Sequence, residues 1–147
     1  MTQRMILIST NHPHLRFPSV DVLRALQLVY RGEGKELPAL AIVFTSSRSI
    51  RKINREFLKH DYVTDVIAFP LGEDGGVEGE IYINLDAARN QAREYDVTYT
   101  QESRRLLLHG ALHLLGYRDK TALEKKKISM REEMYLELMN RKKGSKI

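Results

Sequence analysis

The hydrophobic pattern along the chain alternates between two periods and predicts strands and helices in turn. Short apolar runs bounded by turn residues predict strands near residues 5–9, 40–46, 64–70 and 80–86. Apolar positions that recur every three or four residues predict helices near residues 19–34, 47–59, 85–95, 99–116 and 122–142. Ser19 or Asp21 is suited to cap the first helix, and Thr121 with Glu124 forms a capping box for the last.

The order of these elements indicates the fold class. Helices separate the early strands, whereas the third and fourth strands follow each other directly. This order predicts an α/β (α+β) fold in which one mixed sheet of about four strands packs against about five helices. Residues 1–147 suffice for one domain and are too few for two, so we expect a single domain. We expect the acidic, glycine-rich connection at 71–79 to be mobile and the basic residues 140–147 to form a frayed tail.

Composition narrows the class of protein. Apolar residues make up 42% and charged residues 29% of the chain, as in ordinary soluble proteins. No apolar run approaches the roughly 18 residues of a membrane span, and the first residues lack the apolar core of a secretory signal. We therefore expect a cytoplasmic protein with no membrane partner. Because the chain has no cysteine, any transition metal must be held by imidazole and carboxylate groups.

The predicted fourth helix leads into the stretch HGALHLLGYRD, residues 109–119. Residues four apart lie on one face of a helix, so His109 and His113 can direct both imidazoles at one point. Gly116 can end the helix in a left-handed conformation and bring Asp119 back toward the pair. Three ligands on one side of an ion leave its other side open, as a catalytic zinc site requires.

Other interpretations of these residues remain open. Histidines four apart on an apolar helix also occur as ordinary core or surface residues. Asp119 can instead cap the next helix, although Thr121 and Glu124 already supply a capping box. The helix around the histidines is apolar almost all round, which is typical of a buried helix, and a buried histidine needs a polar partner such as a metal. Three other histidines compete with Asp119 for the third position: His12, His14 and His60.

The same ligand spacing occurs in zinc proteases of the metzincin type. Those enzymes place a glutamate directly after the first histidine to accept a proton from water, and this chain has Gly110 there. Glu102 and Arg105, one or two turns earlier on the same helix face, can orient an imidazole or a substrate, or form a surface salt bridge. The missing glutamate makes peptide hydrolysis the weaker alternative.

The predicted second helix carries a cationic strip. In a projection at about 100° per residue, five basic side chains fall within roughly 100° of arc: Arg48, Arg51, Lys52, Arg55 and Lys59. Ile50, Ile53 and Phe57 occupy the opposite face. The strip is either an ordinary solvated face or a surface that follows RNA phosphates. No aromatic RNA-binding signature accompanies it, so we expect recognition of RNA backbone and shape, not of bases.

Three stretches resemble the YbeY family of metal-dependent endoribonucleases, which act in ribosomal RNA maturation. HGALHLLGYRD is similar to the family pattern HGxLHLxGYDH. INREFLKHDYVTDVIAFP is similar to an LN-containing helix followed by TDVLSFP, and GEIYIN to the strand that comes next. The resemblance runs from about residue 43 to the last helix.

This resemblance implies a single-strand-specific endoribonuclease that holds one divalent ion, with zinc as the expected metal, through His109, His113 and Asp119. It implies ribosomal RNA and the small ribosomal subunit as partners, and no small-molecule organic cofactor. Asp65 and Arg105 are expected as catalytic residues around the ion, and the cationic strip as the RNA-binding surface.

Two departures from the family pattern concern the chemistry. The third ligand is usually a histidine and is Asp119 here; a carboxylate still binds zinc, and it also suits other divalent metals. The family usually carries an arginine five residues after Ile53, where this chain has Leu58, with Lys59 beside it as a substitute. Leu58 therefore keeps open a non-catalytic ribosome-assembly factor with a structural metal, and Gly110 counts against a metalloprotease-like hydrolase.

Overall fold

The computed structural model describes residues 5–72 and 76–141. Within these residues the strands are β1 (Ile6–Asn11), β2 (Leu40–Thr45), β3 (Val66–Pro70) and β4 (Gly79–Asn84), and they form one sheet in the order β1-β2-β4-β3. β1, β2 and β4 are parallel, and β3 runs antiparallel to β4. The mixed four-stranded sheet expected from the sequence is confirmed.

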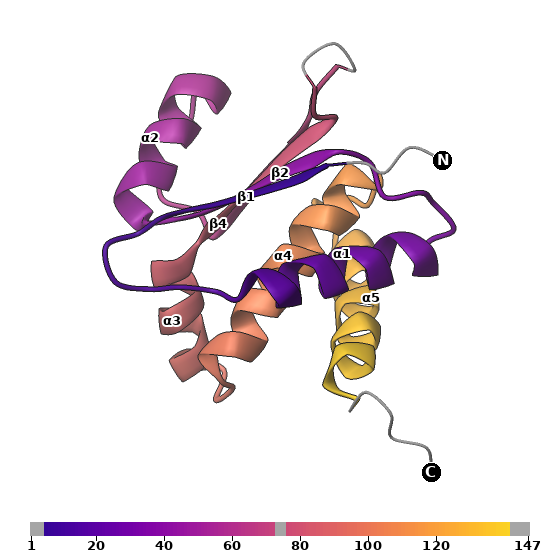
Figure 1. The fold of residues 1–147 in the computed structure, drawn as a ribbon. Coiled ribbons are helices and arrows are strands. Elements are labelled where there is room, and N and C mark those ends of the chain that lie inside the picture. The colour runs from indigo at the N-terminus through magenta and orange to yellow at the C-terminus, as the bar shows by residue number, and fades with distance from the viewer. Residues whose placement is uncertain (1–4, 73–75, 142–147) are drawn as a thin grey trace.

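The expected helices are also present in the described residues: α1 (Ser19–Gly32), α2 (Ser47–Leu58), α3 (Leu85–Glu94), α4 (Tyr99–Leu114) and α5 (Ala122–Asn140). Figure 1 shows α1, α4 and α5 gathered below one face of the sheet, whereas α2 stands apart from them beyond one end of the strands. None of the helices in the described parts of the chain is long and apolar enough to cross a membrane.

The helix ends follow the sequence in part. Thr121 caps α5 and forms the expected capping box with Glu124. The expectation for α1 is wrong, because its N-cap is Pro18, which makes no side-chain cap, and Asp21 pairs instead with Arg104 of α4 at 2.8 Å. Asn140, expected in the frayed tail, is the last residue of α5. Residues 142–147 of that tail, and 73–75 of the connection expected to be mobile, lie outside the described residues.

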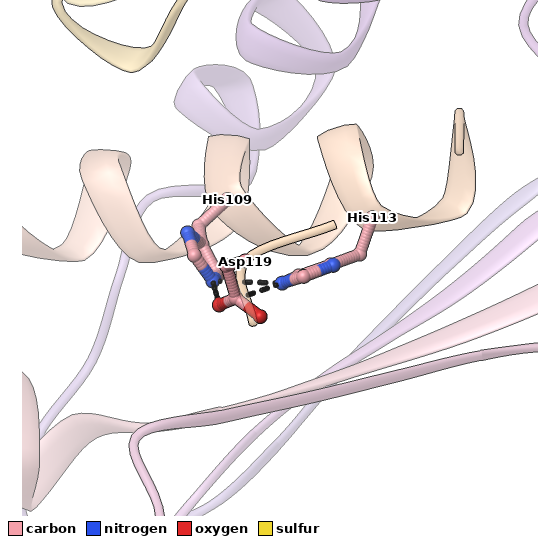
Figure 2. A group of neighbouring side chains, drawn as sticks. All are labelled: His109, His113 and Asp119. Carbon is pink, nitrogen blue, oxygen red and sulfur yellow. Dashed lines mark hydrogen bonds and ion pairs between the residues drawn. The ribbon is translucent and has the colours of Figure 1, made fainter. Parts of the chain in front are cut away.

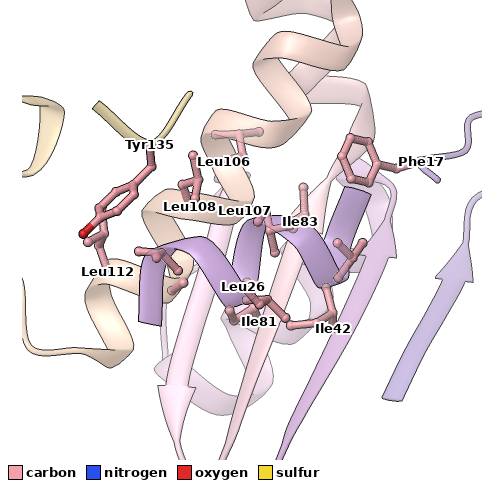
Figure 3. Packing of buried hydrophobic residues seen from close by; sticks show 14 of the residues in the cluster. Phe17, Leu26, Ile42, Ile81, Ile83, Leu106, Leu107, Leu108, Leu112 and Tyr135 are labelled. Carbon is pink, nitrogen blue, oxygen red and sulfur yellow. The ribbon is translucent and has the colours of Figure 1, made fainter. Parts of the chain in front are cut away.

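The core lies between α4 and one face of the sheet. Alternate residues of β2 and β4 bury their side chains on this face: Leu40, Ile42, Phe44, Ile81 and Ile83. Leu106, Leu107 and Leu108 are consecutive and fully buried, because α4 contacts the sheet on one side and α1, α3 and α5 around it. Figure 3 shows side chains from α1, α4, α5 and the sheet meeting there. α4 is therefore the buried central helix that its sequence predicts.

Gly110 allows α4 to approach the sheet closely. A Cβ atom at this position would lie 2.6 Å from Cγ2 of Ile81 and 3.3 Å from Cγ2 of Val66. Protein interiors are packed too densely to absorb such overlap without a shift. A side chain at position 110 would therefore point into the packed core, and a glutamate there could not take the proton-accepting role that it has in metzincin proteases.

We expect Gly110→Ala to lower the free energy of unfolding by about 1–2 kcal/mol. The 2.6 Å contact with Ile81 calls for the upper part of the overpacking cost, about 2–3 kcal/mol, and the better helix propensity of alanine offsets about 1 kcal/mol. Urea titration followed by circular dichroism measures the change. Gly72→Ala is the control, since no described atom lies within 4 Å of its Cβ position. A Gly110→Ala protein as stable as the wild type would show that the contact with Ile81 is not close.

Candidate metal centre

The side chains of His109, His113 and Asp119 converge at the C-terminal end of α4 (Figure 2). The two Nε2 atoms are 2.9 Å apart, and Asp119 Oδ2 lies 3.2 Å from that of His109 and 3.3 Å from that of His113. Ligand atoms bound at about 2.0–2.1 Å to a tetrahedral zinc ion are about 3.3 Å from one another. The three atoms therefore have nearly the spacing of one face of a zinc coordination tetrahedron.

Gly116 sets the turn that brings Asp119 to the histidines. Its φ of 107° is rarely adopted by residues with a side chain. Its N–H donates to the carbonyl of His113, and the N–H of Tyr117 donates to the carbonyl of Leu112, both at 3.0 Å. These are the two hydrogen bonds of a Schellman motif, so the left-handed glycine expected at the end of the helix is confirmed.

Each imidazole is oriented through its Nδ1 atom. His113 Nδ1 lies 2.9 Å from the carbonyl oxygen of Tyr117, and His109 Nδ1 contacts the carboxylate of Glu132. Because both of these oxygens are acceptors, the Nδ1 atoms carry the proton in the neutral rings and the Nε2 lone pairs face Asp119. Two lone pairs 2.9 Å apart beside a carboxylate repel one another unless a cation or proton lies among them. This donor set fits a divalent metal ion.

Glu132 connects the centre to a buried chain of ion pairs. Its side chain is only 3% exposed, and its second oxygen accepts from Arg105 Nη1 at 3.1 Å. Arg105 in turn donates from Nε to Glu102 Oε1 at 2.9 Å and pairs through Nη2 with the other oxygen. Burial lowers the pKa of His109, but the hydrogen bond and charge of Glu132 and the charges of Asp65 and Asp119 raise it by more, so this pKa lies above its usual value.

Glu132 is the residue of the centre that sequence reasoning missed. It lies 23 positions from His109 and on a different helix, so no local spacing links the two. A signal is nevertheless present in α5, where the buried residues are Ile128, Glu132, Tyr135, Leu136 and Met139. An acidic residue within such an apolar stripe needs a buried partner, because an unpaired charge is costly away from water.

The centre opens into a cavity of about 520 Å³. Asp65 lines this cavity, and its Oδ2 accepts from Gln91 Nε2 at 3.2 Å. Leu58 also lines it, so the position where the family pattern has an arginine borders the same cavity as the metal centre. Arg105 is not among the described lining residues; its guanidinium lies behind His109, between Glu102 and Glu132. The catalytic roles expected for Asp65 and Arg105 stay predictions.

The cationic strip lies on a separate hollow of about 550 Å³ along α2, which we call the basic hollow. Its lining residues are Ser47, Arg48, Arg51, Lys52, Arg55 and Val63. Lys59 is the C-cap of α2 and does not line the hollow. Asp61 pairs with Arg51 at 3.0 Å and with Arg55 at 3.9 Å, and the Arg51 hydrogen bond lowers the pKa of Asp61. Phe57, on the face opposite the strip, is 66% exposed.

The other histidines do not join the centre. His12 is buried with its ring against Asp86 (2.8 Å), and its Nδ1 accepts from the backbone N–H groups of His14 and Leu15. His60 lines the cavity but is not part of the ligand group. In the described part of the chain, His109, His113 and Asp119 form the one group of three or more residues suited to hold a metal ion.

An α/β fold in which a buried helix and the turn after it present three candidate metal ligands to an open cavity is typical of a metal-dependent hydrolase. The family model described as Endoribonuclease YbeY matches residues 19–140, and the chain belongs to this family.

Named relatives support this assignment. The chain is 42% identical over 118 residues to the endoribonuclease YbeY of Chlorobium luteolum, covering 80% of this chain and 86% of that protein. It is 37% identical over 140 residues to that of Chlorobium chlorochromatii, covering 95% and 90%. The solution structure of TM1509 from Thermotoga maritima matches with a TM-score of 0.62 and 26% identity, over 97% of this chain and 100% of that one.

The ligand set leads to a first prediction for the centre. Asp119→Ala, His109→Ala and His113→Ala should each weaken metal binding by more than the roughly 10–100-fold typical of residues that only orient a ligand. Asp119→His should retain the metal, since it supplies an imidazole in place of the carboxylate. Metal content after dialysis and titration with zinc measure both. His60→Ala is the matched control, because His60 lines the cavity outside the ligand group. Equal retention by Asp119→Ala and wild type would exclude Asp119 as a ligand.

The contact between Glu132 and His109 leads to a second prediction for the centre. Glu132→Gln removes the charge that orients His109 and turns an amide toward Arg105, so zinc affinity should fall by about 10–100-fold while the three ligands remain. Calorimetric titration measures it, with circular dichroism to verify folding. The exposed neighbour gives the control, since Glu133→Gln should leave affinity unchanged. Unchanged affinity in Glu132→Gln would mean that α4 alone orients the imidazole.

Proposed function

We propose that this protein is a zinc-dependent endoribonuclease that cuts single-stranded ribosomal RNA during maturation of the small ribosomal subunit in the cytoplasm. The observation that carries the proposal is the open three-ligand centre, in a chain of the YbeY endoribonuclease family. The basic hollow, which offers cations for the phosphates of a strand, supports the choice of RNA.

Zinc is the proposed metal because two imidazole nitrogens and one carboxylate oxygen match the donors of several catalytic zinc sites. When bound, the ion supplies Lewis-acid polarisation of a phosphodiester oxygen. The carboxylate of Asp119 makes the site less selective than three imidazoles would, so manganese or magnesium is the alternative. No organic cofactor is needed for hydrolysis of a phosphodiester bond.

The chain's own groups divide the remaining work. In hydrolysis, a water oxygen forms a bond to phosphorus, the bond from phosphorus to the leaving ribose oxygen breaks, and that oxygen takes up a proton from the solvent. We assign Asp65 the role of accepting the proton of the attacking water; its lining of the cavity and its hydrogen bond from Gln91 support this role. Lys120 on the same lining attracts the phosphate. Arg105 acts as a positioning residue through Glu132, which orients His109.

Two alternatives stand against this proposal. A ribosome-assembly factor with a structural metal would use the same basic hollow without cleaving RNA. Leu58 favours this alternative, because it lines the cavity at the position where the family pattern has an arginine. A metalloprotease-like hydrolase would need a carboxylate directly after His109, and the contact of Gly110 with Ile81 leaves no room for one.

Cleavage of single-stranded RNA tests the proposal. The zinc-loaded protein should cut a single-stranded RNA and leave its duplex intact, and His113→Ala should abolish cutting with folding preserved. The matched control is His14→Ala, which removes an exposed histidine that does not line the cavity. Gel analysis of labelled RNA and circular dichroism give the two readouts. RNA binding without metal-dependent cleavage would favour the assembly factor, and peptide hydrolysis without RNA affinity would favour the protease-like alternative.

Binding in the basic hollow is tested in the same assay. The triple variant Arg51→Ala, Lys52→Ala, Arg55→Ala should bind RNA more weakly and flatten the plot of log affinity against log salt by about 0.7 for each lost contact with a single strand. Metal content should not change, because the hollow and the metal centre have no lining residue in common. An unchanged salt dependence would show that the strip is an ordinary solvated face.

A further inference from the structure

Two exposed rings lie on the wall of the metal-centre cavity. His60 and Tyr62 both line it, with ring centroids 5.3 Å apart and ring planes tilted by 32°. Tyr62 is 54% exposed, so the ring leaves much of its surface open to solvent. Exposed aromatic rings next to a reactive centre are suited to hold a flat, apolar part of a substrate.

Asn54 fixes the backbone that carries these rings. Asn54 is buried. Its backbone carbonyl accepts from the backbone N–H of His60 at 3.2 Å, and its side-chain Nδ2 donates to the backbone carbonyl of Tyr62 at 3.1 Å. Lys59 adopts a left-handed φ of 61°, which ends α2 and turns the chain into this segment. The rings are therefore presented from a backbone held at both positions, and little ordering is needed when a ligand binds.

Basic residues line both hollows that meet at the segment carrying the rings. Val63, directly after Tyr62, lines the basic hollow, and Lys120 lines the cavity together with the rings. The acidic residue between the two rings in sequence, Asp61, pairs with Arg51 and Arg55. A strand that runs from the basic hollow past the rings to Lys120 would meet basic side chains before and after them. An RNA strand has the matching alternation, since each flat base lies between two phosphates.

We infer that His60 and Tyr62 form a stacking site for one unpaired nucleobase of the RNA strand, next to the phosphodiester held at the metal centre. The inference rests on the proposed function and names the feature that selects single strands. In a duplex both faces of a base are covered by its neighbours, so the rings cannot reach them. Stacking tolerates any base, and the site therefore adds contact with bases without reading sequence.

RNA binding by the zinc-loaded full chain tests the stacking site. Fluorescence anisotropy at low temperature measures affinity, with a gel to verify that the probe stays uncut. Tyr62→Ala should weaken binding of a short single-stranded RNA by about 5- to 150-fold and leave affinity for the matching duplex unchanged. Tyr62→Phe keeps the ring and should keep the affinity. The matched control is Phe57→Ala, because Phe57 is a more exposed aromatic residue of α2 that lines neither hollow.

A fluorescent base gives a second measurement, its quenching at one position of the strand, which would not depend on the Tyr62 ring if Tyr62 only supported the fold. 2-Aminopurine loses fluorescence when it stacks on an aromatic ring. Walking this base along the strand should locate one position that is quenched by the wild type and by Tyr62→Phe, and not by Tyr62→Ala. A similar but smaller effect is expected for His60→Ala, because imidazole offers less surface to the base.

The outcomes separate this inference from the proposed function. Wild-type strand affinity in Tyr62→Ala, or an equal loss for strand and duplex, overturns the stacking site and leaves the endoribonuclease proposal standing. Failure of the wild type to bind single-stranded RNA removes the proposed function and the stacking site together. Loss of strand binding in Tyr62→Ala alone, with quenching retained in Tyr62→Phe, supports the site.

Discussion

The contact between the Nδ1 atom of His109 and the buried carboxylate of Glu132 joins the metal centre to the fold. One oxygen of Glu132 fixes which nitrogen of His109 faces the cavity. The other oxygen pairs with Arg105, which also pairs with Glu102. A carboxylate this deeply buried is stable only with such partners. The packing of α5 against α4 and the orientation of the first ligand are therefore one interaction, and each depends on the other.

The cavity and the basic hollow have different structural supports. The candidate metal ligands lie at the end of a buried helix, where packing holds them with the precision that coordination needs. The cationic side chains lie on α2, which stands apart from α1, α4 and α5 (Figure 1). Phosphate recognition tolerates such a position because charge attraction acts over about 8–10 Å at physiological salt. The segment held by Asn54 connects the two.

The sequence predicts those parts of the structure that depend on neighbours along the chain. The strand and helix periods, the capping box at Thr121, the turn at Gly116 and the His109–His113 pair are all local, and the structure has them. Glu132 could not be placed, because its partner is set by how α5 packs on α4. The exposure of Phe57 likewise depends on how α2 packs against the rest of the fold. Neither feature produces a periodic pattern in the sequence from which it could be predicted.

The Schellman turn at Gly116 has a consequence for how the protein is assembled. Two candidate ligands come from a helix and the third from the segment after its final turn. The oxygen that orients His109 comes from the next helix. These groups meet only when the turn has closed and both helices have docked, so a partly folded chain offers a weak site. An ion bound there would stabilise the finished fold selectively, by RT ln(1 + [M]/Kd), so the supply of metal would set how much of the folded protein resists unfolding.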